Sequence, residues 1–151
     1  MKIKLLFAAL LIAPLCAISL HAGTPAQDKE FVDKYKTAFE KGDKATLESF
    51  LYTKGANPEA LEFYKMMMTP DAGAKISKIE LVDLTPEDVK KASETMTGPD
   101  GSKAQLSLKP TKKLKITVET KDANGSSSSS SENFVAEKDG KYVIPVPASV
   151  K

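Results

Sequence analysis

The spacing of the hydrophobic residues changes once along this chain, and this change restricts the fold class more than any other feature. Up to Met68 the hydrophobic residues recur at intervals of three and four, which predicts helices. From Lys75 onward they mostly alternate with polar residues, which predicts strands. Because the helices come first, the sequence predicts an α+β domain in which N-terminal helices pack on one face of a mainly antiparallel sheet.

Turn and capping residues divide the first half into three predicted helices. Gly42 ends the first helix, and Asp43 is placed to cap the second. Asn57 and Pro58 predict the start of the third helix, because proline at the first helical position lacks only an N–H that the helix leaves unused. The hydrophobic stripes are Phe31, Tyr35, Ala38 and Phe39 in the first helix, Leu47, Phe50 and Leu51 in the second, and Leu61, Tyr64, Met67 and Met68 in the third.

The second half combines strand patterns with one short helix. Thr85 and Asp88 form a capping box around Pro86, which predicts the start of that helix. The Asp139-Gly140 pair between alternating hydrophobic residues predicts a hairpin turn. The expected strands cover residues 75–84, 104–108, 114–118, 133–137 and 142–146.

Two features interrupt these strand patterns. Residues 122–131 are predicted to form a mobile hairpin loop, because the six consecutive serines Ser126–Ser131 have no capacity to form a core. Pro145 and Pro147 indicate that the last strand lies at a sheet edge or stops pairing there.

The beginning of the chain has the order of an export signal. Two lysines precede a hydrophobic stretch from Leu5 to Leu20, which Pro14 interrupts. A membrane span needs about 20 hydrophobic residues, so this stretch is too short and too interrupted to be one. We expect cleavage after Ala22, with cleavage after Ala26 or an uncleaved anchor as alternatives.

Cleavage after Ala22 defines two parts of the chain. Residues 1–22 are the predicted signal peptide, and residues 23–151 are a single domain. The mature domain is predicted to be exported, either periplasmic or secreted, and to have no membrane span.

Removal of the signal peptide also reduces the chemistry that the chain can perform. The sequence has 22 lysines, no arginine and 20 acidic residues, and two of the lysines lie before residue 23, so the mature chain is formally neutral. Its one cysteine, Cys16, and its one histidine, His21, are lost with the signal peptide. The mature chain therefore forms no disulfide, no thiolate nucleophile and no Ser–His pair.

The same composition argues against nucleic acid, metals and cofactors. A neutral chain without arginine lacks both the charge that displaces counterions and the fork that pairs with guanine. Zinc and copper(II) prefer imidazole and thiolate ligands. Met66, Met67 and Met68 are consecutive on a helix, so they cannot all face one ion. We expect no metal, no cofactor and no nucleic-acid partner.

A basic cluster at the start of one predicted strand consists of Lys109, Lys112, Lys113 and Lys115. We expect these lysines at a solvated sheet edge, where they hinder strand-to-strand aggregation, and contact with anionic surfaces is the alternative. A catalytic Ser–Lys pair assembled by the fold also stays open.

Two short motifs resemble the NTF2-like (cystatin-like) superfamily. Within Phe31–Leu51, residues 40–43 resemble its Gly-Asp break between the first two helices, and residues 137–142 resemble its closing Asp-Gly-Lys-aromatic hairpin. The resemblance implies a curved antiparallel sheet that forms a cone around a long N-terminal helix, as in small exported bacterial members of unknown function. Enzymes of this superfamily place an aspartate, a histidine or a tyrosine inside the cone. No such aspartate stands out here, so the resemblance implies a non-catalytic member.

These observations favour an exported, non-catalytic binding or interaction domain of the cell envelope. Its partner is expected to be a small apolar molecule held between the helices and the sheet, or an envelope protein. The predicted lining residues are Tyr35, Phe39, Phe50, Tyr64, Met67, Leu106 and Ile116. The alternatives are an isomerase- or dehydratase-type enzyme that uses Tyr35 with a carboxylate, and a structural module with a filled core.

Overall fold

The computed structural model describes residues 23–71, 73–98, 101–122 and 125–150. The predicted signal peptide, residues 1–22, lies outside the described residues. Three of the described helices precede the long strands, and this arrangement confirms the predicted α+β class. The helices are α1 (Pro25–Lys41), α2 (Lys44–Glu48), α3 (Pro58–Met68) and α4 (Pro86–Ser93).

Helix α1 is bounded by local capping interactions. The Gln27 N–H donates a hydrogen bond to the Thr24 hydroxyl at 3.3 Å, and the Thr24 N–H donates one to the Gln27 side chain at 2.7 Å. At the other end, Gly42 has the left-handed conformation (φ 65°) that glycine adopts without strain. The buried residues of α1 are the predicted stripe, namely Phe31, Tyr35, Ala38 and Phe39.

The described strands form two sheets. The larger sheet has the spatial order β1 (Leu51–Tyr52), β7 (Lys141–Pro145), β6 (Gly125–Lys138), β5 (Lys112–Asp122) and β2 (Lys75–Asp83). The smaller sheet has the order β3 (Met96–Thr97), β4 (Lys103–Leu106) and β8 (Pro147–Ser149). The pairing of β1 with β7 is parallel, whereas the other described strand pairs are antiparallel.

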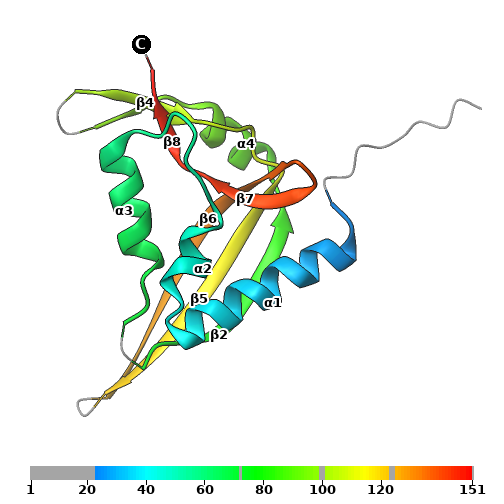
Figure 1. The fold of residues 1–151 in the computed structure, drawn as a ribbon, viewed down its shortest axis with the longest axis vertical. Coiled ribbons are helices and arrows are strands. Elements are labelled where there is room, and N and C mark those ends of the chain that lie inside the picture. Colours follow the sequence, from blue (N-terminus) through cyan, green and yellow to red (C-terminus); the bar gives the residue numbers. More distant parts are fainter. Residues whose placement is uncertain (1–22, 72, 99–100, 123–124, 151) are drawn as a thin grey trace, which may run out of the picture.

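Helix α1 lies against one face of the larger sheet, and the smaller sheet and α4 lie beyond one end of it (Figure 1). The core forms between α1 and this face, because alternate residues of the strands point toward the helix. Burial of a large aliphatic side chain stabilises a fold by about 2 kcal/mol. The aliphatic side chains most deeply buried here are Leu47, Leu114, Val135, Ile144 and Val146.

The turns near the C-terminus follow the sequence. Asp139 and Gly140 both have positive φ angles, 52° and 72°, as a tight hairpin turn requires. Pro145 is the last residue of β7, and Pro147 is the first residue of β8, which is an edge strand of the smaller sheet. The predicted turn is confirmed. Of the two alternatives for the prolines, the structure shows the edge position for Pro147, and pairing continues there with Leu106 of β4.

The second helix is shorter than its hydrophobic pattern predicts. Helix α2 ends at Glu48, and Leu51 belongs to strand β1, so the assignment of Phe50 and Leu51 to this helix is wrong. The Ile144 N–H donates a 2.7 Å hydrogen bond to the Phe50 carbonyl. Pairing with β7 therefore replaces another helical turn at this point.

The prediction of a mobile loop at residues 122–131 is wrong for the serines that the structure describes. Ser126–Ser131 form part of β6 and pair in antiparallel register with residues 116–121 of β5. All six serines are exposed, so the backbone pairing, and not side-chain burial, places them in a strand. The side-chain oxygens of Ser130 and Thr117 lie 3.1 Å apart across the two strands. Residues 123 and 124 lie outside the described residues.

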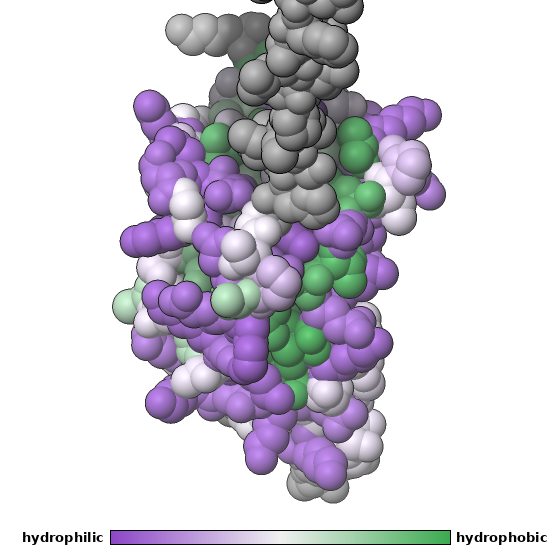
Figure 2. Space-filling view, turned by 90° about the vertical axis from the view of Figure 1, so that its right-hand side faces the viewer, coloured by the Kyte–Doolittle hydropathy of each residue, from purple (hydrophilic) through white to green (hydrophobic). Residues whose placement is uncertain are grey.

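One face of the molecule is mainly hydrophilic, with a narrow hydrophobic band between polar side chains (Figure 2). Across the described ranges, no helix combines the length and the apolar character that a membrane crossing requires.

Candidate functional site

Four of the seven predicted lining residues lie together in the hydrophobic core. Tyr35, Phe39, Phe50 and Ile116 are all buried in the cluster between α1 and the larger sheet. The Phe50 ring centroid lies 5.6 Å from that of Tyr35 and 5.1 Å from that of Phe31, distances typical of packed aromatic pairs. These side chains therefore pack mainly against one another.

The other three predicted residues occupy different surroundings. Tyr64 is partly buried against the same core cluster. Met67 is 46% exposed, and it forms an exposed face of α3 with Phe63 and Met66. Leu106 is on β4 in the smaller sheet, where it lines a separate pocket. The structure thus does not bring the seven residues to one site.

The pocket at Leu106 lies between α4 and the segment from β4 to the start of β5, and it has a volume of about 440 Å³. Its hydrophobic lining residues are Leu84, Val89, Ala92, Leu106, Leu108 and Pro110, and its polar lining residues are Ser93, Gln105 and Lys109. Val89 is 47% exposed, which places a hydrophobic side chain at the open side of the pocket. We take this pocket as the candidate functional site.

Local sequence signals position the two walls. Thr85 and Asp88 form the predicted capping box that starts α4. At the end of this helix, the Gln105 side-chain amide donates a 3.0 Å hydrogen bond to the Ser93 carbonyl, so β4 is linked to α4 across the pocket. Strand β4 ends at Leu106 and not at residue 108 as predicted, and the residues after it turn toward β5 and complete the wall.

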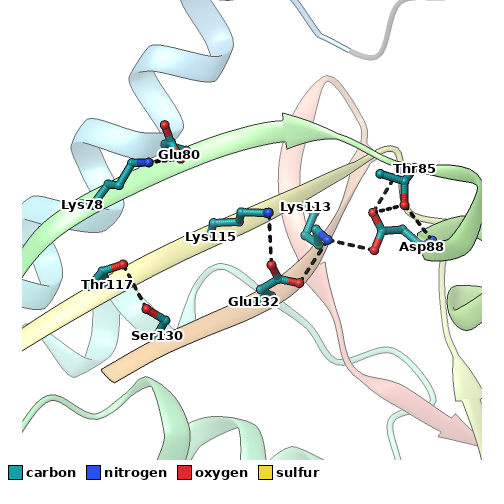
Figure 3. A network of polar contacts seen from close by, with 9 residues as sticks. All are labelled: Lys78, Glu80, Thr85, Asp88, Lys113, Lys115, Thr117, Ser130 and Glu132. Atoms are coloured by element: carbon teal, nitrogen blue, oxygen red, sulfur yellow. Dashed lines mark hydrogen bonds and ion pairs between the residues drawn. The ribbon is translucent and has the colours of Figure 1, made fainter. Parts of the chain in front are cut away.

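A buried ion pair holds the beginning of α4 against the larger sheet (Figure 3). Lys113 on β5 donates a 2.8 Å hydrogen bond to Asp88, and both residues are buried. The Thr85 hydroxyl donates to the other Asp88 oxygen at 2.8 Å, and Lys113 also lies 3.0 Å from Glu132 on β6. The hydrogen bond from Lys113 holds the pKa of Asp88 well below its ordinary value.

The basic cluster is divided among different partners. Lys112 lies 3.0 Å from Asp28, and Lys115 lies 3.3 Å from Glu132. The prediction that these lysines lie at a solvated sheet edge is wrong, because β5 lies between β6 and β2 and Lys113 is buried. Lys109 differs from the others in lining the pocket, and among the described residues it has no ion-pair partner within 4.0 Å.

Tyr35 and Tyr142, the buried tyrosines of the core, are unsuited to proton transfer near neutral pH. Burial raises the pKa of Tyr35 to about 12. Tyr142 donates a 2.6 Å hydrogen bond to Asp28, and burial together with this bond raises the pKa of Tyr142. Within the described parts of the chain, no group of three or more cysteine, histidine or acidic side chains is arranged to hold a metal ion.

Comparisons of the chain with protein-family models, with curated proteins and with solved structures find no match.

Sequence reasoning missed most of the pocket. Val89 and Ala92 are three positions apart on α4, and Leu106 and Leu108 alternate along the chain, so each wall has a recognisable hydrophobic pattern. Lys109 stands in the sequence beside Lys112, Lys113 and Lys115, which form ion pairs, and no local signal distinguishes it from them. The local patterns do not specify that the two hydrophobic faces meet, because that requires contact between distant segments.

Proposed function

We propose that this protein is an exported, non-catalytic binding domain that holds a small apolar molecule between α4 and β4. The observation that carries the proposal is the pocket of about 440 Å³, which is within the range of about 300–1,000 Å³ that small-molecule sites have. Its walls are mainly hydrophobic, with a few polar groups at defined positions. A ligand in this pocket would remove Val89 from water and gain the free energy of hydrophobic burial.

The position of α1 supports the proposed export cleavage. Thr24 and Gln27 form the capping box, and Pro25 is the first residue of the helix. Cleavage after Ala22 leaves these interactions intact, whereas cleavage after Ala26 would remove Thr24 and Pro25. The fold thus favours the first of the two cleavage positions.

We also propose that the larger sheet and α1 correspond to the NTF2-like cone. The features that support this are a long N-terminal helix against a mainly antiparallel sheet, the helix break at Gly42 and the closing hairpin at Asp139 and Gly140. In this interpretation the interior of the cone is occupied by the core aromatic side chains, and the ligand site lies outside it.

The enzyme alternative is less well supported. Tyr35 is 2% exposed, and its raised pKa keeps the phenol protonated at neutral pH. The buried carboxylate of Asp88 is held in its charged form by Lys113. Neither group is suited to act as a general base or acid near neutral pH.

The proposal is tested with neutral apolar probes, 1-N-phenylnaphthylamine and decanol, and the protein purified from cells that express the full chain. We expect saturable binding of both probes. Val89→Asp places a carboxylate at the pocket and should weaken binding at least about tenfold, because the ligand would bury part of that charge. Val150→Asp is the matched control, because Val150 has a similar exposure of 45% and does not line the pocket.

The two variants also give the result that would contradict the proposal. Absence of saturable binding to the parent protein, or equal weakening in both variants, would show that the pocket does not hold an apolar molecule. Urea unfolding curves of both variants verify that the fold is retained.

A further inference from the structure

Among its described lining residues, the candidate pocket contains one charged side chain, Lys109. None of the described residues in its lining is acidic. The nearby Asp88 is already engaged with Lys113 at 2.8 Å, and Glu132 with Lys113 and Lys115 at 3.0 and 3.3 Å. The lysine of the pocket thus lies beside a hydrophobic surface, without an anionic partner among the described residues.

This combination differs from that of the other lysines in the same cluster. Lys112 pairs with Asp28 and Asp83 at 3.0 and 3.2 Å, and Lys113 is buried between two carboxylates. Lys109 follows Leu108 and precedes the buried Pro110, so it is held at the pocket by residues that themselves line it. An ammonium group has three donors and no acceptor, and it therefore selects an anionic partner.

We propose that the ligand is an aliphatic carboxylate whose alkyl chain lies on Val89, Leu106 and Leu108 and whose carboxylate pairs with Lys109. The proposal rests on the proposed function and defines the chemical class of its ligand. The alkyl chain supplies most of the affinity through hydrophobic burial. The ammonium group supplies the preference for an anion over a neutral ligand of the same chain length.

The size of this preference follows from the exposure of Lys109. Because its side chain is exposed, solvent weakens the ion pair, and we expect decanoate to bind about three- to fivefold more tightly than decanol at low salt. Decylamine should bind more weakly than decanol, because two like charges would face each other. High salt should reduce the preference for decanoate, since salt screens exposed charges.

The test measures displacement of bound 1-N-phenylnaphthylamine by decanoate, decanol and decylamine, again with protein from cells that express the full chain. Lys109→Gln should remove the preference for decanoate over decanol. Lys103→Gln is the matched control, because Lys103 is an exposed lysine on β4 that does not line the pocket. It should retain the three- to fivefold preference.

The outcomes separate this inference from the proposed function. Equal binding of decanoate and decanol by the parent protein, or an unchanged preference in Lys109→Gln, would overturn the carboxylate inference while the apolar pocket stands. Failure of all three ligands and of the neutral probe would refute the pocket as a binding site. Matching unfolding midpoints for the two lysine variants exclude misfolding as the cause of either result.

Discussion

Removal of the Tyr35 hydroxyl should change the stability of the protein in alkaline solution. Tyr35 is buried among Phe31, Phe50 and the larger sheet. Burial raises its pKa from 10.0 to about 12 in the folded protein, because the phenolate would be poorly solvated there. In the unfolded chain the same phenol ionises near its ordinary value of 10.0.

The direction and size of the effect follow from this difference. Below pH 10 the phenol is neutral in both states, and its contribution to stability is fully present. Between pH 10 and about 12 the unfolded state loses this proton and the folded state retains it, so stability falls. Each pH unit corresponds to about 1.4 kcal/mol, so the loss reaches roughly 3 kcal/mol at the upper limit.

The assay is urea unfolding of the parent protein and of Tyr35→Phe at intervals from pH 8 to about pH 12. Phenylalanine does not titrate, so the stability of the variant relative to the parent should rise by roughly 3 kcal/mol across this interval. Other titrating groups, including the lysines, contribute equally to both proteins. Tyr52→Phe, which removes the hydroxyl of a half-exposed tyrosine, is the control for loss of a phenol that is not buried.

Two results would refute this reasoning. Parallel stability curves for the parent and Tyr35→Phe would show that the phenol ionises equally in the folded and unfolded states. Phenolate absorbance that appears at pH 10 for all tyrosines of the folded protein would show the same directly. Either result would restore Tyr35 as a candidate for proton transfer.

Three further predictions concern stability. Ser107→Ala should raise the free energy of unfolding by about 1 kcal/mol, because the buried Ser107 hydroxyl has no hydrogen-bond partner among the described residues, and thermal unfolding measures this change. Asp88→Asn should lower the urea unfolding midpoint at pH 7. The difference in midpoint between the variant and the parent should shrink below about pH 3.8, because the parent then begins to lose the stabilisation from this low-pKa carboxylate. A difference that stays constant with pH would contradict the ion-pair explanation. Gly42→Ala should lower the free energy of unfolding by about 1 kcal/mol, because Gly42 ends α1 in the left-handed conformation (φ +65°) that residues with a Cβ rarely adopt, and thermal unfolding measures this change. No described atom lies within 4 Å of the new Cβ, so the change reports the backbone cost alone.

Hydrophobic spacing and capping residues predict most of the helices correctly. The capping signals at Gly42, Asn57 and Thr85 coincide with observed helix ends. Such signals act over three or four residues, so neighbouring side chains are sufficient to define them. Local sequence is a weaker guide where the backbone pairs with a distant strand.

Phe50 and the serines illustrate this weakness. The hydrophobic spacing around Phe50 fits a helix, but its carbonyl accepts a hydrogen bond from Ile144 of β7, which lies far along the chain. Ser126–Ser131 have the composition of a loop, yet they pair with β5 over the whole run. In both segments, backbone hydrogen bonds to another strand determine the structure, and composition does not report them.

The candidate site depends even more on long-range contacts. Lys109, Lys112, Lys113 and Lys115 look alike in the sequence, and only their neighbours in the fold distinguish a pocket residue from a buried ion pair. The pairing of Lys113 with Asp88 joins residues 25 positions apart. That contact fixes α4 against the sheet and so determines where one wall of the pocket lies.

Local sequence patterns are sufficient to predict that helices precede the long strands, where most helices are capped and where the hairpin turns, because these features depend on neighbouring residues. Only the tertiary structure shows that the aromatic residues predicted to line a site pack into the core, and that the pocket lies between α4 and β4. Burial and cavity shape are produced by segments that meet from distant parts of the chain, so no local pattern contains them.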